Sequence, residues 1–299
     1  MEPDPAPHPL ARVLAARGWV LADGAMATSL YARGLTPGEA PERWVETHPE
    51  RVRALHAAAV EAGAEVILTN SFGANAPRLA AWGAAGRAAA LNRAAAEIAR
   101  EAAGLAVIVA GSMGPTGGGV EAETVAVFEA QARALMAGGA DFVWLETFGD
   151  AAEFRAAAEG AARAGAPWCG TMSFEAGSVK AGGRSRGGLS PADLVGLVAG
   201  LGHPPLAYGA NCGAGPAETV ATIAAFRDAG ARGPLIAKAN AGLPRAEGGG
   251  FVYDVTPAGM ADYAVAARAA GARIIGGCCG VTPDHLRAMR AALDERSRA

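Results

Sequence analysis

Hydrophobic positions along the chain form short, nearly continuous runs that alternate with longer stretches of helical spacing. Eight of these runs are rich in apolar and β-branched residues, as expected of strands that are buried on both faces. They lie at residues 19–24, 65–72, 106–115, 142–148, 168–174, 206–212, 235–241 and 273–279. Helical stretches lie between them, for example at 49–63, 90–104, 124–139, 219–230 and 260–271. The alternation predicts repeated βα units and a parallel sheet.

Eight βα pairs within residues 19–293 predict an α/β fold, a single-domain (β/α)8 TIM barrel. Residues 1–18 are expected to be an N-terminal extension and residues 294–299 a C-terminal tail. The alternative is a Rossmann-like sheet, but no predicted strand is followed by the Gly-x-Gly-x-x-Gly turn of that fold. The glycine-rich stretch near Gly117 lacks the lysine of a phosphate-binding loop. Long loops follow the first, third, fifth and seventh strands, on the barrel face that carries active sites.

Composition and charge favour a globular protein that acts on a small molecule. Hydrophobic residues make up 51% of the chain and charged residues 18%, and the net charge is −3 with 26 basic and 29 acidic residues. No basic patch indicates nucleic acid or an anionic membrane as a partner. The first 18 residues lack the basic and apolar segments of a signal peptide, so we expect a cytoplasmic location.

The cysteines are the strongest chemical signal. Cys212 ends the sixth predicted strand, and Cys278 and Cys279 end the eighth, so three thiols are expected at one rim of the barrel. Three thiolates suit zinc and leave one tetrahedral position open, as in catalytic sites. Such a site activates water poorly but favours a fourth, substrate thiolate, and hence alkyl transfer to sulfur. The alternatives are buried thiols, a vicinal disulfide or a redox switch; Cys169, within a strand, is expected in the core.

Other strand ends carry groups that could bind an amino acid with a thiol side chain. Asp23 and Glu146 are candidates for holding a substrate ammonium group, although Asp23 could instead organise a turn. Asn211 and Asn240 could contact substrate, fill the vacant zinc position or serve as turn residues. Lys238 is expected at the edge of the core. A substrate carboxylate could bind the backbone amides that follow the first strand, those of Gly24, Ala25, Met26 and Ala27.

Taken together, the motifs resemble the homocysteine S-methyltransferase family over residues 19–293. They are LADGAMATSL, ILTNSFGAN, GSMGPTG, WLETF, GANCGAGP, NAGLP and IIGGCCGVTPDHLRAM. The resemblance implies a (β/α)8 barrel with Zn²⁺ on Cys212, Cys278 and Cys279, which forms methionine from homocysteine and a small methyl donor. It also implies that Asp23, Glu146 and the amides after Asp23 hold homocysteine.

The methyl donor is the open part of this prediction. The chain most resembles bacterial proteins described as betaine-homocysteine methyltransferases, so betaine is the leading donor. In animal betaine enzymes a tyrosine stands where this chain has Gly73, and a donor-site tryptophan aligns near Ala40, close to Trp44. S-methylmethionine is an alternative donor. Another is methylcobalamin on a separate corrinoid protein, which would make the chain one component of a split methionine synthase.

A non-enzymatic alternative is a thiol-based zinc or redox sensor. Such a sensor would have no need for Asp23 and Glu146 at the rim that carries the cysteines.

Overall fold

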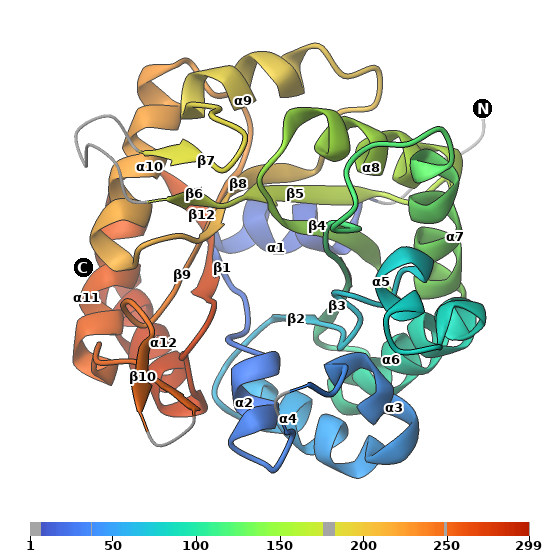
Figure 1. Cartoon of the computed structure of the whole chain (residues 1–299). Coiled ribbons are helices and arrows are strands. Elements are labelled where there is room, and N and C mark those ends of the chain that lie inside the picture. Colours follow the sequence, from blue (N-terminus) through green and yellow to red (C-terminus); the bar gives the residue numbers. More distant parts are fainter. Residues whose placement is uncertain (1–6, 37, 176–182, 248–249, 299) are drawn as a thin grey trace, which may run out of the picture.

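Eight parallel strands form the centre of the molecule, and the chain returns to its first strand to close a barrel (Figure 1). The computed structural model describes residues 7–36, 38–175, 183–247 and 250–298. The strand order is β1-β12-β9-β8-β5-β4-β3-β2, and a parallel bridge between Ala22 and Val66 joins the two ends. The predicted (β/α)8 barrel is therefore confirmed. Its strands are β1 (Val20–Leu21), β2 (Val66–Leu68), β3 (Ile108–Met113), β4 (Phe142–Phe148), β5 (Trp168–Met172), β8 (Ala207–Cys212), β9 (Leu235–Ala239) and β12 (Ala272–Gly277).

Helices surround the strands as an outer ring (Figure 1). They are α4 (Pro49–Glu61), α6 (Ala88–Ala103), α7 (Thr124–Ala137), α8 (Ala151–Arg163), α9 (Pro191–Ala199), α10 (Pro216–Asp228), α11 (Pro257–Ala269) and α12 (Pro283–Arg298). Shorter elements lie in the loops: α2 (Ala27–Tyr31), η1 (Pro41–Arg43), α3 (Trp44–Thr47), α5 (Ala76–Ala80) and η2 (Ala85–Arg87), with the two-strand pairs β6 (Phe174–Glu175) with β7 (Arg184–Ser185) and β10 (Arg245–Glu247) with β11 (Gly250–Val252). Within the described ranges, no helix is both long enough and apolar enough to cross a membrane.

The side chains that face the barrel interior change from apolar to polar along the strands toward the mouth, the face formed by the carboxyl ends of the strands. In β4, for example, Phe142 and Trp144 belong to the interior apolar cluster, and Glu146 lies two residues further along the strand. The other end of the barrel is closed by helix α1 (Pro9–Arg17), whose Leu10 and Leu14 pack into the same cluster. Much of the expected N-terminal extension is thus a helix that packs against the barrel.

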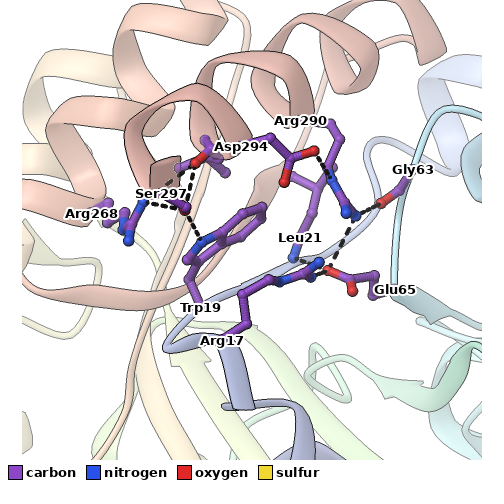
Figure 2. Close-up of polar contacts among 10 residues, drawn as sticks. Arg17, Trp19, Leu21, Gly63, Glu65, Arg268, Arg290, Asp294 and Ser297 are labelled. Carbon is purple, nitrogen blue, oxygen red and sulfur yellow. Dashed lines mark hydrogen bonds and ion pairs between the residues drawn. The ribbon is translucent and has the colours of Figure 1, made fainter. Parts of the chain in front are cut away.

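A polar cluster at this lower end joins the first strand to the last helix (Figure 2). Trp19 is fully buried and its indole N–H donates to Ser297 Oγ at 2.9 Å. The guanidinium groups of Arg17 and Arg290 lie 4.3 and 5.5 Å from the Trp19 ring centroid, and both pair with Glu65. We call Arg17, Trp19, Glu65, Arg290 and Ser297 the basal cluster. Because α12 continues to residue 298, the tail expected from residue 294 is largely helical.

Candidate active site

Three cysteine side chains meet at the mouth of the barrel. The Sγ atom of Cys212, at the end of β8, lies 3.3 Å from that of Cys278 and 3.9 Å from that of Cys279. All three sulfurs lie within 4.8 Å of one another. Tetrahedral zinc with Zn–S bonds of about 2.3 Å holds its sulfur ligands roughly 3.8 Å apart. The dimensions and the thiol chemistry of this cluster therefore fit zinc, whereas Cys169 is fully buried in the interior as expected.

The end of the β9–β12 ladder lets two adjacent cysteines share the cluster. The Cys278 N–H still donates to Ala239 O at 2.7 Å, and the chain then turns, with Gly280 at φ 80°. A Cβ atom on Gly280 would lie 2.2 Å from Cγ of Tyr253, so only glycine fits this turn. Asn240 supports the turn, because its Oδ1 accepts from Cys279 N–H at 3.0 Å and its Nδ2 donates to Gly213 O at 2.9 Å. Asn240 thus already bonds to the backbone around two of the thiols.

The close approach of the three thiols makes them differ in acidity. Hydrogen bonds from Cys212 and Cys278 lower the pKa of Cys279, and a hydrogen bond with Tyr253 lowers it further. The pKa of Cys212 is raised well above its ordinary value, first because it shares hydrogen bonds with Cys278 and Cys279. Cys279 is therefore the most acidic of the three thiols. Tyr253 follows the β10–β11 hairpin, and the pattern of hydrophobic residues in the sequence did not predict its contact with Cys279.

Glu146 lies in the interior near the end of β4, and only one of its two carboxylate oxygens accepts a hydrogen bond from a described protein group. Burial raises the pKa of Glu146 to about 7, with Lys238 opposing the rise. Ser112 Oγ donates to Glu146 Oε1 at 2.5 Å. Within the described part of the chain, Ser112 is the only hydrogen-bond donor to this carboxylate, so Oε2 can accept from a substrate ammonium group.

Asp23 is close to the same site but already has two partners. Its Oδ2 accepts from Leu68 N–H at 2.7 Å, and its Oδ1 accepts from Lys238 Nζ at 2.9 Å. Lys238 is 2% exposed, and its ammonium group lies 5.2 Å from the Trp144 ring centroid. Burial favours the neutral amine, but Asp23 and Glu146 outweigh it and raise the pKa of Lys238. Lys238, expected at the core edge, is thus an interior cation. The sequence could have indicated this, because Lys238 lies two residues before Asn240 and side chains at this spacing in a strand point to the same face.

The loop after β1 is held against the segment that follows the cysteines. A Cβ atom on Gly24 would lie 2.7 Å from Val281 O, and the Ala25 N–H donates to that oxygen at 3.4 Å. Met26 precedes helix α2, which begins at Ala27. Behind the loop is a cavity of about 30 Å³ whose lining includes Gly24, Ala25, Met26 and His56. Three of the four residues predicted to offer carboxylate-binding amides, Gly24, Ala25 and Met26, therefore line this cavity, and the Ala25 amide already donates to Val281 O.

Asn211, another candidate for substrate binding, bonds to the end of β4. Its Oδ1 accepts from Thr147 N–H at 2.8 Å, and its Nδ2 donates to Thr147 Oγ1 at 2.7 Å. Among the side chains expected to contact substrate, Asp23, Asn211 and Asn240 thus bond mainly to protein groups. Glu146 retains the most capacity for a ligand.

Neither Gly73 nor Trp44, which lies a few residues from the aligned position Ala40, supplies an exposed aromatic ring for a donor cage. Trp44 is 3% exposed and packs against His48, with a distance of 4.5 Å between the ring centroids. At Gly73, the N–H donates to Glu42 Oε1 at 2.6 Å, and a Cβ atom would lie 2.7 Å from that oxygen. An aromatic side chain is therefore excluded at residue 73 unless Glu42 moves.

Comparisons with known proteins agree with this architecture. The profile of a family described as homocysteine S-methyltransferase matches residues 20–293. Methionine synthases of Mycobacterium leprae and Mycobacterium tuberculosis are 33% and 32% identical over 92% of this chain, which spans 24% of their length. The homocysteine methyltransferase MmuM of Escherichia coli, solved in a metallated form, has a TM-score of 0.76 and 30% identity over 95% of this chain and 99% of its own. A Methanosarcina mazei methyltransferase, at 15% identity and a TM-score of 0.60 over 95% of this chain and 98% of its own, shares the fold.

Proposed function

We propose that this chain, which belongs to the homocysteine S-methyltransferase family, uses zinc on Cys212, Cys278 and Cys279 to methylate homocysteine and form methionine. The observation that carries the proposal is the cluster of three thiols at the barrel mouth, with sulfur spacings that suit tetrahedral zinc. The metallated form of the Escherichia coli homologue supports the choice of a metal. When bound, zinc would lower the pKa of a substrate thiol and present it as a thiolate.

The protein's own groups bind and orient the substrate. Glu146 accepts hydrogen bonds from the substrate ammonium group, whose positive charge favours the ionised carboxylate. The carboxylate of homocysteine lies toward the loop of Gly24–Ala27, where backbone N–H groups are available at the start of α2. Asp23, whose Oδ1 accepts from Lys238 Nζ at 2.9 Å, is the second acidic group proposed for the substrate ammonium. With sulfur and donor methyl held in line, the S–CH₃ bond forms as the bond from the methyl to its leaving atom breaks.

Betaine stays the first donor to test, on the sequence resemblance. Trimethylammonium groups are commonly held by aromatic cages. Residues 44 and 73 do not supply one here, so turnover with betaine would require other aromatic side chains of the mouth, such as Phe72 and Tyr253. S-methylmethionine is the alternative among small cationic donors.

A second candidate function is the homocysteine-binding component of a split methionine synthase. It is favoured by the match to about a quarter of each mycobacterial methionine synthase. The β10–β11 hairpin also exposes the apolar side chain of Phe251, which is 67% exposed. Phe251 lies two residues before Tyr253, which contacts Cys279. In this function a separate corrinoid protein would bring the methyl group.

The test is methionine formation by the purified, zinc-loaded protein with betaine, S-methylmethionine and methylcobalamin compared side by side. Cys212→Ala should lose both zinc and activity, because it removes one of three ligands. Cys169→Ala is the matched control, since it removes a buried thiol outside the cluster and should retain zinc. If Cys212→Ala kept its zinc and its activity, the proposal would be wrong. Zinc binding without methionine formation from any donor would favour the sensor.

A further inference from the structure

One amide side chain joins the two halves of the candidate site. Asn211 lies at the end of β8, next to Cys212, and Thr147 lies near the end of β4, next to Glu146. Strand β5 separates β4 from β8 in the sheet, so the Asn211 side chain bridges the width of one strand. The Thr147 N–H donates to Asn211 Oδ1 at 2.8 Å, and Asn211 Nδ2 donates to Thr147 Oγ1 at 2.7 Å. We call this pair of hydrogen bonds the Asn211–Thr147 clamp.

The clamp holds a strained backbone on both sides. Thr147 and Cys212 both have φ of 62°, and in the described part of the chain no other residue except glycine has positive φ. Such a conformation is rare for a β-branched residue such as Thr147, so it persists only where surrounding contacts fix it. Because Thr147 follows Glu146 directly, its backbone sets the direction in which the end of β4 leaves the barrel. The conformation of Cys212 likewise sets the direction of its Sγ.

The same amide also reaches a second thiol. Asn211 Nδ2 lies 3.7 Å from Cys278 Sγ, within hydrogen-bond range for sulfur. A donor of this kind stabilises a thiolate and fixes the orientation of a metal ligand. All three polar functions of the Asn211 side chain are thus directed at protein groups: the backbone and hydroxyl of Thr147, and the thiol of Cys278.

We propose that Asn211 and Thr147 are positioning residues that couple zinc retention to homocysteine binding. The proposal rests on the proposed function, because it assigns zinc to the cysteines and the substrate ammonium to Glu146. Fixing the end of β4 for the ammonium group and fixing Cys212 and Cys278 for zinc both depend on the Asn211 side chain. Each ligand therefore stabilises the arrangement that the other needs, and by thermodynamic linkage the effect is reciprocal.

The test is the zinc affinity of Thr147→Val, measured by competition with a chelator in the absence and presence of homocysteine. Valine is isosteric with threonine and equally β-branched, so it leaves the backbone strain unchanged and removes only the hydroxyl. Loss of a partner of a metal ligand typically weakens metal binding by about 10–100-fold. We expect Thr147→Val to bind zinc about 10-fold more weakly, to raise the KM for homocysteine more than it lowers kcat, and to lose part of the increase in zinc affinity that homocysteine causes.

Two further variants separate positioning from simple loss of stability. Thr147→Ser keeps the hydroxyl and should restore wild-type zinc affinity. Thr171→Val removes another buried hydroxyl, which accepts from the indole N–H of Trp144 at 3.1 Å, and it should leave zinc affinity unchanged even if the melting temperature falls. Wild-type zinc affinity in Thr147→Val, or an equal loss in Thr171→Val, would overturn the clamp alone. A wild-type chain that binds no zinc would overturn the proposed function as well.

Discussion

Replacing Lys238 with methionine should destabilise the fold through a charge left without its partner. Lys238 and Asp23 have side chains that are 2% and 8% exposed, and their charged atoms lie 2.9 Å apart. Methionine has a similar length and fills the same volume, so packing changes little. The main effect is a buried Asp23 carboxylate that keeps only the Leu68 N–H as a partner. Breaking a buried pair in this way costs about 3–5 kcal/mol. At about 2–4 °C per kcal/mol for a domain somewhat smaller than this one, we expect the melting temperature to fall by about 10 °C.

The effect should depend on pH in a defined direction. Burial already raises the pKa of Asp23 above its ordinary value, and the loss of Lys238 raises it further. A group whose folded pKa exceeds its unfolded pKa contributes stability at low pH, which is lost as pH rises through the folded value. Lys238→Met should therefore come closest to wild-type stability at acid pH, near the ordinary Asp pKa of 3.8, and should lose stability as pH rises toward neutrality. Urea unfolding followed by circular dichroism at acid and at neutral pH measures the difference.

A double variant supplies the control for this reasoning. Asp23→Leu combined with Lys238→Met removes both charges and should recover most of the loss, because replacing a whole buried pair with apolar groups is often nearly neutral. If Lys238→Met were as stable as wild type at the higher pH, or if the double variant were no better than the single one, the ion pair would not be the source of the effect.

Three other outcomes follow from the described contacts. Because the pKa of Glu146 is about 7, kcat/KM for homocysteine should rise with pH through neutrality, and Glu146→Gln should flatten this rise in a pH-rate profile. Burial lowers the pKa of His56 to about 4, whereas the unfolded value is 6.5. The folded protein should therefore lose about 3 kcal/mol of stability as pH falls from 6.5 to below 4, because the unfolded chain binds the proton more readily. His56→Leu should remove this loss, which urea midpoints measured across that pH range would show. Gly73→Ala should lower the melting temperature by displacing Glu42, whereas Gly86→Ala, where a Cβ atom meets nothing within 4 Å, should not.

The sequence predicted the barrel and the meeting of the cysteines because both depend on chain order and strand direction. Parallel strands place their carboxyl ends on one face, so Cys212 and Cys278 had to approach each other once their strands were assigned. Strand alternation likewise brought Glu146 to the interior.

Side-chain partners were harder to predict, because they depend on reach and backbone conformation rather than on periodicity. Lys238 pairs with Asp23 across the interior because its long side chain bends toward a carboxylate on a distant strand. The clamp on Asn211 exists because Thr147 adopts positive φ, which no pattern of apolar residues reveals. The sequence therefore left the roles of Asp23 and Asn211 open between substrate binding and structural support, and in the structure both bond to protein groups.

The basal cluster has a consequence for how this protein is made in a cell. Trp19 and Ser297 are separated by 278 positions, and closing a loop of that length costs about 5 kcal/mol of chain entropy by (3/2)RT ln n. During synthesis, β1 emerges from the ribosome long before its partners β12 and α12, so its apolar edge must wait for nearly the whole barrel to be translated. Because β1 pairs with β12, the barrel can close only after β12 has been synthesised, and we expect the unpaired strand edges to be open to chaperone binding until then.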